Sequence, residues 1–161
     1  MNKNEFAKIV LESTDSLYHI SKSILQNDAD CEDAVQEAIA TAFAKLHTLK
    51  QEQYAKTWLT RILINECYNI LRKQKKLVPM SDYETEAEYE TDDYSELYKA
   101  LLRLKKEYRL TIVLYYLEGY SVKEIARIMR TGEGTVKSCM SRGRKLLKSI
   151  LEEENAYEII S

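Results

Sequence analysis

The sequence predicts an all-α fold made of two small helical domains that an acidic linker joins. Its 161 residues are enough for one ordinary domain or for two small ones. Residues 1–78 contain neither glycine nor proline, so nothing there forces a helix to end except short polar turns. Residues 79–95 open with the only proline, are strongly acidic and lack aliphatic periodicity, as is typical of a solvated linker. No alternation of apolar and polar residues is long enough to predict a sheet.

Charge is distributed unevenly along the chain, although the formal net charge is only −2. We expect the two domains at residues 1–76 and 96–161, with the linker at 77–95. The linker carries seven acidic and no basic side chains, whereas residues 51–76 and 96–150 have net charges of +4 and +8. Two such basic blocks are the electrostatic pattern of a nucleic-acid-binding surface. Charge alone leaves solvated helix faces as an equal alternative.

The first domain is predicted to begin with two amphipathic helices. Apolar residues recur at helical spacing over residues 6–24, and in the polar turn that follows Asp30 is placed to cap the next helix. That second helix has one apolar face over residues 34–46 and an opposite acidic and polar face. The acidic face consists of Glu32, Asp33, Gln36 and Glu37. An acidic first turn also suits the helix dipole, so this face has a purely structural explanation as well.

The third helix, over about residues 54–76, is predicted to carry a basic and aromatic face beside its apolar one. Cys67 falls on the apolar side, where we expect a small buried hydrophobe rather than a catalytic thiol. Trp58 lies at the edge of the other side, whose members are Arg61, Asn65, Tyr68, Asn69, Arg72 and Lys75. Cations that hold phosphates and aromatics that stack on unpaired bases suit a single-stranded nucleic acid. A tryptophan in one helix is more often a core residue, and its position does not decide between the two.

The second domain is predicted to begin with one helix over residues 97–119, which ends at Gly119. Ser121 and Glu124 then form a capping box that opens a short helix. The short helix is expected to bury Ile125, Ala126 and Met129. Thr131 and Gly132 form the turn that follows.

A further helix after this turn completes a pattern typical of a helix-turn-helix, whose second helix fits a major groove. Its inward residues are Val136, Met140, Gly143 and Leu147, and its outward residues include Ser141. The candidate DNA-binding residues on the outer face and its flanks are Thr135, Lys137, Ser138, Cys139, Arg142, Arg144 and Lys145. Ordinary helical hairpins show similar spacing, and the excess of positive charge in this domain is what favours a DNA-binding motif.

Three of these segments resemble, in the same order, motifs of the extracytoplasmic-function (ECF) sigma factors of bacterial RNA polymerase. Residues 30–37 are similar to the family's D-x-E-D-x-x-Q-E helix, and residues 57–65 with Leu71 and Arg72 to its W-L-x-R-I-x-x-N segment. Residues 134–138 with Ser141 and Arg142 resemble its G-T-V-K-S-R-x-x-R-A-R run. The sequence departs from the family at three positions. Cys139 replaces the usual Arg, Gly143 the usual Ala and Asn69 a common Asp.

The resemblance implies a promoter-specificity subunit. The helix around residues 30–37 would bind the clamp of core polymerase, and the third helix would recognise and melt the minus-ten element. The loop at about residues 50–57 would supply a pocket for flipped bases, and the last helix would read the minus-thirty-five element. The implied partners are the polymerase core (clamp and flap), promoter DNA and an anti-sigma factor.

Several other classes of protein are disfavoured by the sequence. Cys31, Cys67 and Cys139 lie far apart and the chain has two histidines, which argues against a disulfide framework and a zinc site. No nucleophile-base set or metal-ligand cluster is present, so we expect neither an enzyme nor a cofactor. No apolar stretch approaches the roughly 20 residues that span a bilayer, and the first residues lack an apolar signal segment. We therefore expect a cytoplasmic protein without membrane insertion.

Two alternatives remain. A free-standing helix-turn-helix regulator that binds an operator as a homodimer explains residues 96–150 but gives no role to the acidic face or to Trp58 and its neighbours. A purely protein-binding adaptor leaves the positive charge unexplained.

Overall fold

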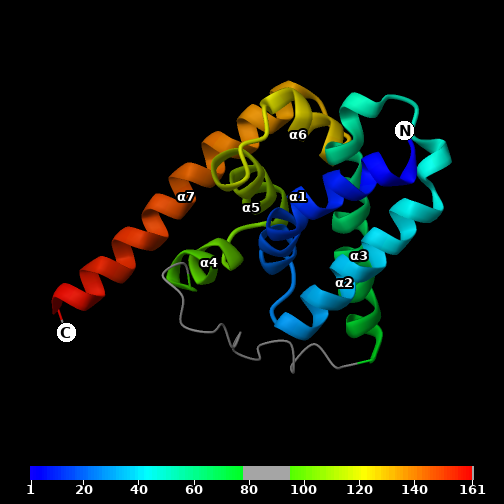
Figure 1. Cartoon of the computed structure of the whole chain (residues 1–161). Coiled ribbons are helices and arrows are strands. Elements are labelled where there is room, and N and C mark those ends of the chain that lie inside the picture. Colours follow the sequence, from blue (N-terminus) through cyan, green and yellow to red (C-terminus); the bar gives the residue numbers. More distant parts are fainter. Residues whose placement is uncertain (78–94, 161) are drawn as a thin grey trace. The chain divides into compact units, whose positions relative to one another are not determined.

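The computed structural model describes residues 1–77 and 95–160, which belong to two compact helical units (Figure 1). The first unit is Met1–Tyr89 and the second is Glu90–Ser161. Within the described residues there is no β-strand, so the all-α prediction is confirmed. The acidic linker predicted at residues 77–95 lies outside the described residues, except for its first and last members, which belong to helices.

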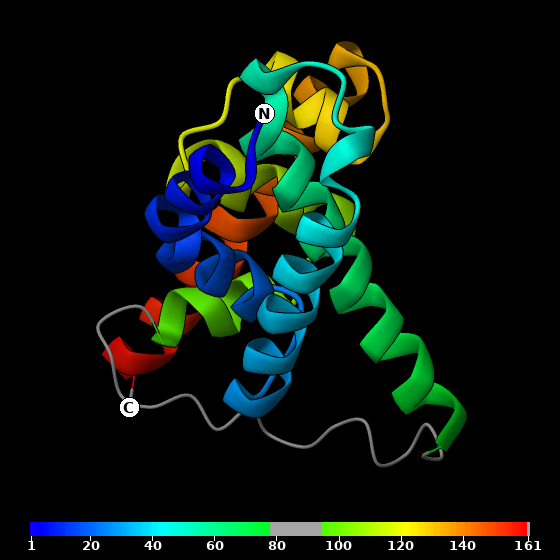
Figure 2. The same ribbon diagram turned by 45° about the vertical axis from the view of Figure 1, so that its right-hand side comes forward.

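Where the structure describes it, at residues 1–77, the first unit is a bundle of three helices, as predicted. The helices are α1 (Lys3–Lys22), α2 (Asp28–Ala44) and α3 (Ala55–Leu77), and each packs against the other two. Figure 2 shows α2 beside α3. Two short 3₁₀ turns, η1 (Leu46–Thr48) and η2 (Glu52–Tyr54), lie in the connection between α2 and α3.

An aromatic cluster joins the three helices of the first unit. The Phe6 side chain of α1 is 0% exposed. Its ring lies edge-on to those of Phe43 in α2 and Trp58 in α3, with centroid distances of 5.1 and 5.9 Å. Aliphatic residues of the three helices continue this core: Val10, Leu17, Ile20, Ala34, Val35, Ala38, Leu59 and Leu63. Burial of this apolar surface, rather than helix propensity alone, stabilises the unit.

The N-cap of α2 is Asn27, so the prediction that Asp30 caps this helix is wrong. The Asn27 side chain accepts a hydrogen bond from the Asp30 backbone N–H at 2.8 Å, and the helix begins at Asp28. Asn is as good an N-cap as Asp, and Asn27 is the first polar residue of the turn, so it can cap a helix that begins earlier than predicted. The Asp30 carboxylate instead accepts from the Asn27 amide and from Gln74 Nε2 of α3, both at 2.7 Å. It therefore ties the start of α2 to α3.

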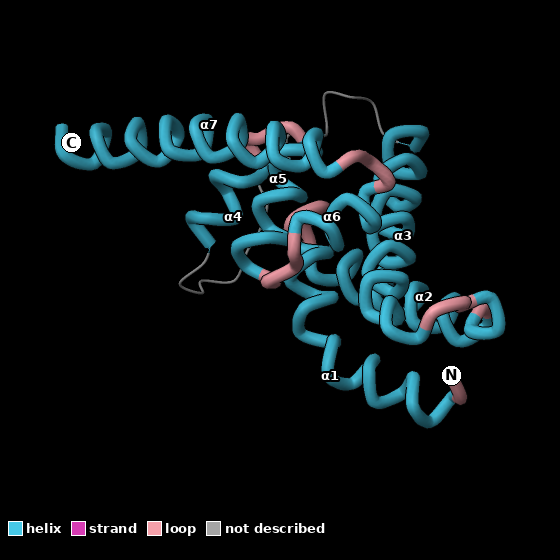
Figure 3. The backbone as a smooth tube through the Cα atoms, turned by 90° about the horizontal axis from the view of Figure 1, so that it is seen from above, coloured by secondary structure: helices cyan, strands magenta, loops and turns pink. Residues whose placement is uncertain are grey.

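Over residues 95–160, the second unit has four α-helices, one more than predicted for this part of the chain. They are α4 (Ser95–Leu102), α5 (Lys106–Ile112), α6 (Val122–Met129) and α7 (Glu133–Ile160), with a π-helical turn, η4 (Val113–Leu117), after α5. In Figure 3, α7 is one continuous helix. No helix in the described part of the chain has both the length and the apolar character needed to cross a bilayer.

The single helix predicted over residues 97–119 is wrong, because the chain breaks between α4 and α5. The Arg103 and Leu104 backbone N–H groups bond to carbonyls three residues earlier, which tightens the end of α4. Lys105 then adopts an extended ψ of 144° and starts α5 afresh. The break lets α4 pack against both α5 and α7, and tertiary packing outweighs the unbroken helical spacing of the sequence.

The helix-turn-helix is confirmed in α6 and α7. Ser121 and Glu124 form the predicted capping box at the start of α6. Ile125 and Ala126 are buried as predicted, but Ile128 takes the place expected for Met129, which is half-buried. The helix ends at Met129, and the left-handed Arg130 (φ 52°) turns the chain there.

The inward stripe of α7 explains why a glycine occupies position 143. Val136, Met140 and Gly143 are buried, and Leu147 is half-buried. A Cβ on Gly143 would lie 2.7 Å from Ile112 Cδ1 and 3.2 Å from Tyr108 Cβ. The glycine therefore permits the close approach of α5 and α7.

We expect Gly143→Ala to destabilise the second unit by about 1 kcal/mol. Overpacking costs about 1–3 kcal/mol, and the higher helix propensity of Ala recovers about 1 kcal/mol of it. The control is Gly134→Ala, where an added Cβ meets nothing within 4 Å and should stabilise α7 by about 0.5 kcal/mol. Thermal unfolding followed by circular dichroism tests both. Equal stabilisation by the two substitutions would contradict the close packing at position 143.

Candidate nucleic-acid interface

The candidate DNA-binding residues of the second unit lie along the first four turns of α7. Six of the seven side chains are exposed and Cys139 is half-buried. The exposed residues are Thr135, Lys137, Ser138, Arg142, Arg144 and Lys145. The structure therefore brings together, on one helix of the helix-turn-helix, the cations and small polar groups that a DNA duplex requires.

An apolar groove lies in the same unit, between α4, the end of α5 with η4, and α7. It has a volume of about 460 Å³. Its lining residues are Leu97, Leu101, Ile112, Tyr116, Leu117, Arg144, Leu147, Lys148, Leu151 and Glu152. One of the candidate DNA-binding residues, Arg144, thus also belongs to the wall of this groove.

Sequence reasoning missed Tyr116, which lies in the wall of this groove. Tyr115 and Tyr116 are both exposed, whereas Val113 and Leu114 just before them are buried. The cause is the π-helical turn η4, which adds a residue to one turn and rotates the side chains that follow. No glycine, proline or charge in this segment signals the turn.

The candidate minus-ten face of the first unit lies along α3. Asn65, Arg72 and Lys75 are exposed, and the other four residues are half-buried. The half-buried residues are Trp58, Arg61, Tyr68 and Asn69. The Arg72 guanidinium donates to Asn69 Oδ1 one turn earlier, so an amide oxygen holds this arginine where the resembled family commonly has a carboxylate. Trp58 packs against Phe6 with part of its ring and keeps another part open to solvent.

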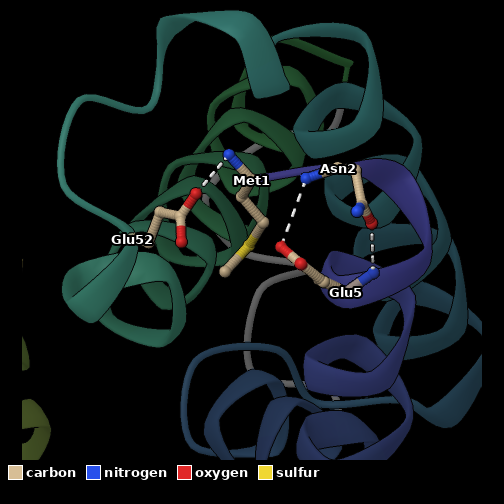
Figure 4. A network of polar contacts seen from close by, with 4 residues as sticks. All are labelled: Met1, Asn2, Glu5 and Glu52. Carbon is tan, nitrogen blue, oxygen red and sulfur yellow. Dashed lines mark hydrogen bonds and ion pairs between the residues drawn. The ribbon is translucent and has the colours of Figure 1, made fainter.

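The loop before Trp58 is anchored to the start of α1. The Met1 ammonium lies 2.5 Å from a Glu52 carboxylate oxygen in η2 (Figure 4). The hydrogen bond with Glu52 raises the pKa of this amino group above its ordinary value. Asn2 and Glu5 form a reciprocal capping box beside it. At the other end of the loop, Thr57 Oγ1 donates to the Tyr54 carbonyl at 2.8 Å. The loop thus has a fixed position at the N-terminal end of α3.

The acidic side chains predicted on α2 form one exposed surface. Glu32, Asp33, Gln36 and Glu37 are all exposed, whereas Ala34 and its neighbours on the opposite face are buried. The spacing of one turn places these four residues on the same side of the helix. Their loss removes no core packing, which makes the surface suitable for substitution experiments.

Cys31 and Cys67 are buried between helices and are not suited to nucleophilic chemistry. Burial raises the pKa of both thiols, so they stay protonated at neutral pH. The prediction that Cys67 is a small buried hydrophobe is confirmed. Among the residues that the structure describes, no group of three His, Cys, Asp or Glu side chains is arranged to hold a metal ion.

Comparisons with known proteins identify both units. Residues 9–77 match the family Sigma-70 region 2, and residues 94–147 match Sigma-70, region 4. The RNA polymerase sigma factor SigV of Bacillus subtilis is 30% identical over 164 residues, covering 96% of this chain and 99% of that protein. The ECF RNA polymerase sigma factor SigM of Mycobacterium tuberculosis is 30% identical over 139 residues, covering 84% of this chain and 71% of SigM.

A solved structure gives the same result. The sigma factor RpoE of Bartonella quintana, crystallised with the anti-sigma factor NepR, is 30% identical in sequence and has a TM-score of 0.80. The similarity covers 92% of this chain and 97% of RpoE. This chain belongs to the extracytoplasmic-function (ECF) sigma factors of bacterial RNA polymerase.

Proposed function

We propose that this protein directs core RNA polymerase to specific promoters and assists their melting, without catalysing a reaction of its own. The observation that carries the proposal is that both sigma regions of the chain present a basic helix face to solvent, and that the face on α3 also carries aromatic side chains. These faces lie on α3 in the first unit and on α7 in the second. A free-standing regulator would need only the second face, and membership of the ECF family favours the sigma-factor function.

The two DNA-binding faces would have different tasks. The outer face of α7 would read the minus-thirty-five element as a duplex, with side chains in the major groove. The α3 face and the loop at residues 50–57 would capture bases flipped from the opened minus-ten element. Flipping costs a few kcal/mol of lost stacking and pairing, which a pocket with aromatic contacts has to offset. The open part of the Trp58 ring and the anchored loop support this division.

The remaining surfaces would bind proteins. We assign the acidic face of α2 to the polymerase clamp and the apolar groove of the second unit to the polymerase flap. The complex of RpoE with NepR supports an anti-sigma factor as a further partner. Since bacterial RNA polymerase transcribes in the cytoplasm, we also place this protein there.

A change of charge on α2 tests the assignment to the clamp. We expect Asp33→Lys to weaken association with core polymerase while the free energy of unfolding changes by no more than about 0.5 kcal/mol, because the residue is exposed. Glu12→Lys on α1, which is also exposed, is the control and should bind core normally. Pull-down of core polymerase together with thermal melting measures both quantities. Normal binding by Asp33→Lys would leave the α2 face as a solvated helix surface.

Run-off transcription tests the proposed function as a whole. Core polymerase with this protein should start transcripts at promoters selected from a random DNA library, and core polymerase alone should not. The free protein should bind the same promoters weakly, because each basic face is small. Tight, sequence-specific binding by the free protein with no effect on core initiation would establish a dimeric regulator instead.

A further inference from the structure

Arg144 differs from the other candidate DNA-binding residues in the place of its guanidinium. Its Nη1 donates a hydrogen bond to the Tyr116 hydroxyl oxygen at 2.7 Å, and both side chains line the apolar groove. On α7, Arg144 lies four residues after Met140 and three before Leu147, which belong to the inward stripe. Residues at this spacing are neighbours on a helix surface. Arg144 is thus held on the groove side of α7.

The Tyr116 ring also contacts a second aromatic ring. It packs edge-on against the Tyr115 ring, with centroids 5.0 Å apart and an interplanar angle of 82°. The Tyr116 side chain is 50% exposed, and its other part lines the groove. The hydroxyl oxygen therefore lies at the rim of the groove, where it accepts the hydrogen bond from Arg144. Without this bond, the long Arg144 side chain could turn toward the outer face of α7.

We infer that Tyr116 is a positioning residue for DNA binding, whose hydroxyl withholds Arg144 from the phosphate backbone while the chain is free. The inference rests on the proposed function, in which the outer face of α7 meets duplex DNA. Loss of the hydroxyl releases the guanidinium, whose position next to Lys145 lets it neutralise one more phosphate. One more phosphate contact releases further counterions and makes binding more dependent on salt.

The test measures the affinity of the full-length variants for a labelled random-sequence duplex by fluorescence anisotropy at several salt concentrations. Tyr116→Phe keeps the ring and removes the acceptor. We expect it to bind about two- to tenfold more tightly at low salt, the range for one net hydrogen bond. The log–log salt slope should steepen by about 0.9, as for one added phosphate. Tyr115→Phe is the matched control and should behave as the wild type.

A second background assigns the effect to Arg144. In the Arg144→Ala variant, a further Tyr116→Phe substitution should change neither affinity nor slope. The inference is overturned if Tyr116→Phe still increases affinity in the Arg144→Ala variant. It is also overturned if Tyr116→Phe alone leaves DNA binding unchanged or weakens it. Weaker binding would mean that the hydroxyl contacts DNA directly. Arg142→Ala separates the two proposals, because unchanged binding by this variant both to the random duplex and to a promoter selected by run-off transcription contradicts DNA contact through α7 itself. If Arg142→Ala binds DNA more weakly and Tyr116→Phe binds as the wild type does, α7 contacts DNA but the Tyr116 hydroxyl does not withhold Arg144.

Discussion

Phe6→Ala should destabilise the first unit by about 3–5 kcal/mol, the usual cost of truncating a buried aromatic side chain. Phe6 is fully buried and contacts aromatic rings of both other helices, so its loss leaves a cavity at the point where α1, α2 and α3 meet. A small domain has a total stability of only about 5–15 kcal/mol. The first unit should therefore lose a large share of its stability, and its midpoint of unfolding should fall well below that of the wild type.

Trp58 makes this prediction easy to measure. It is the only tryptophan of the chain and it touches Phe6, so its fluorescence in a urea titration reports on the first unit alone. Leu11→Ala is the control, because Leu11 lies on the same helix but is 77% exposed, and its substitution should change stability by no more than about 0.5 kcal/mol. A loss below about 1 kcal/mol for Phe6→Ala would mean that the aromatic cluster does not hold the three helices together.

The helices of the first unit were predictable because each has one apolar face and is separated from the next by a polar turn. Phe6, Ala34 and Leu63 each belong to an apolar stripe with regular helical spacing. The polar residues between one stripe and the next indicate where the helices end. The N-cap of α2 was not predictable, since Asn27 and Asp30 are equally good caps. Such a choice depends on the tertiary bond from Gln74 to Asp30, which connects residues 44 positions apart.

The second unit was predicted less well before Gly119 than after it. Ser121, Glu124 and Gly132 are local signals that mark the start of α6 and the turn, and the structure follows them. The break after α4 and the π-helical turn η4 have no such signal. They result from packing of α4 and α5 against α7, which helical spacing alone does not encode.

The candidate sites were likewise predictable where local sequence signals determine them and not where they depend on contacts between distant residues. The exposed faces of α2, α3 and α7 were predictable, because a residue opposite a buried stripe faces solvent. The hydrogen bond of Arg144 to Tyr116 was not predictable, since it joins residues 28 positions apart and Tyr116 lies in the π-helical turn η4, which the sequence does not signal. The close approach at Gly143 likewise depends on Ile112 and Tyr108 of another helix.

Arg142→Ala should weaken binding of the holoenzyme to the upstream promoter element by about 1–3 kcal/mol if this arginine reads a base edge. Arg142 is exposed on the outer face of α7, and a guanidinium can donate two parallel hydrogen bonds to a guanine. Because the side chain is exposed and Ala favours helices, stability should change by no more than about 0.5 kcal/mol. The variant therefore separates recognition from folding.

The measurement compares promoters that differ only in the upstream element, at several salt concentrations. Lys99→Ala removes an equal charge from the exposed surface of α4 and serves as the control, which should leave specificity unchanged. If Arg142 reads a base, the variant should lose its preference for one upstream base pair. An equal loss on all sequences, with a salt slope smaller by about 0.9, would make Arg142 a phosphate contact. Sequence readout would then rest on the neighbouring polar residues Lys137, Ser138 and Lys145.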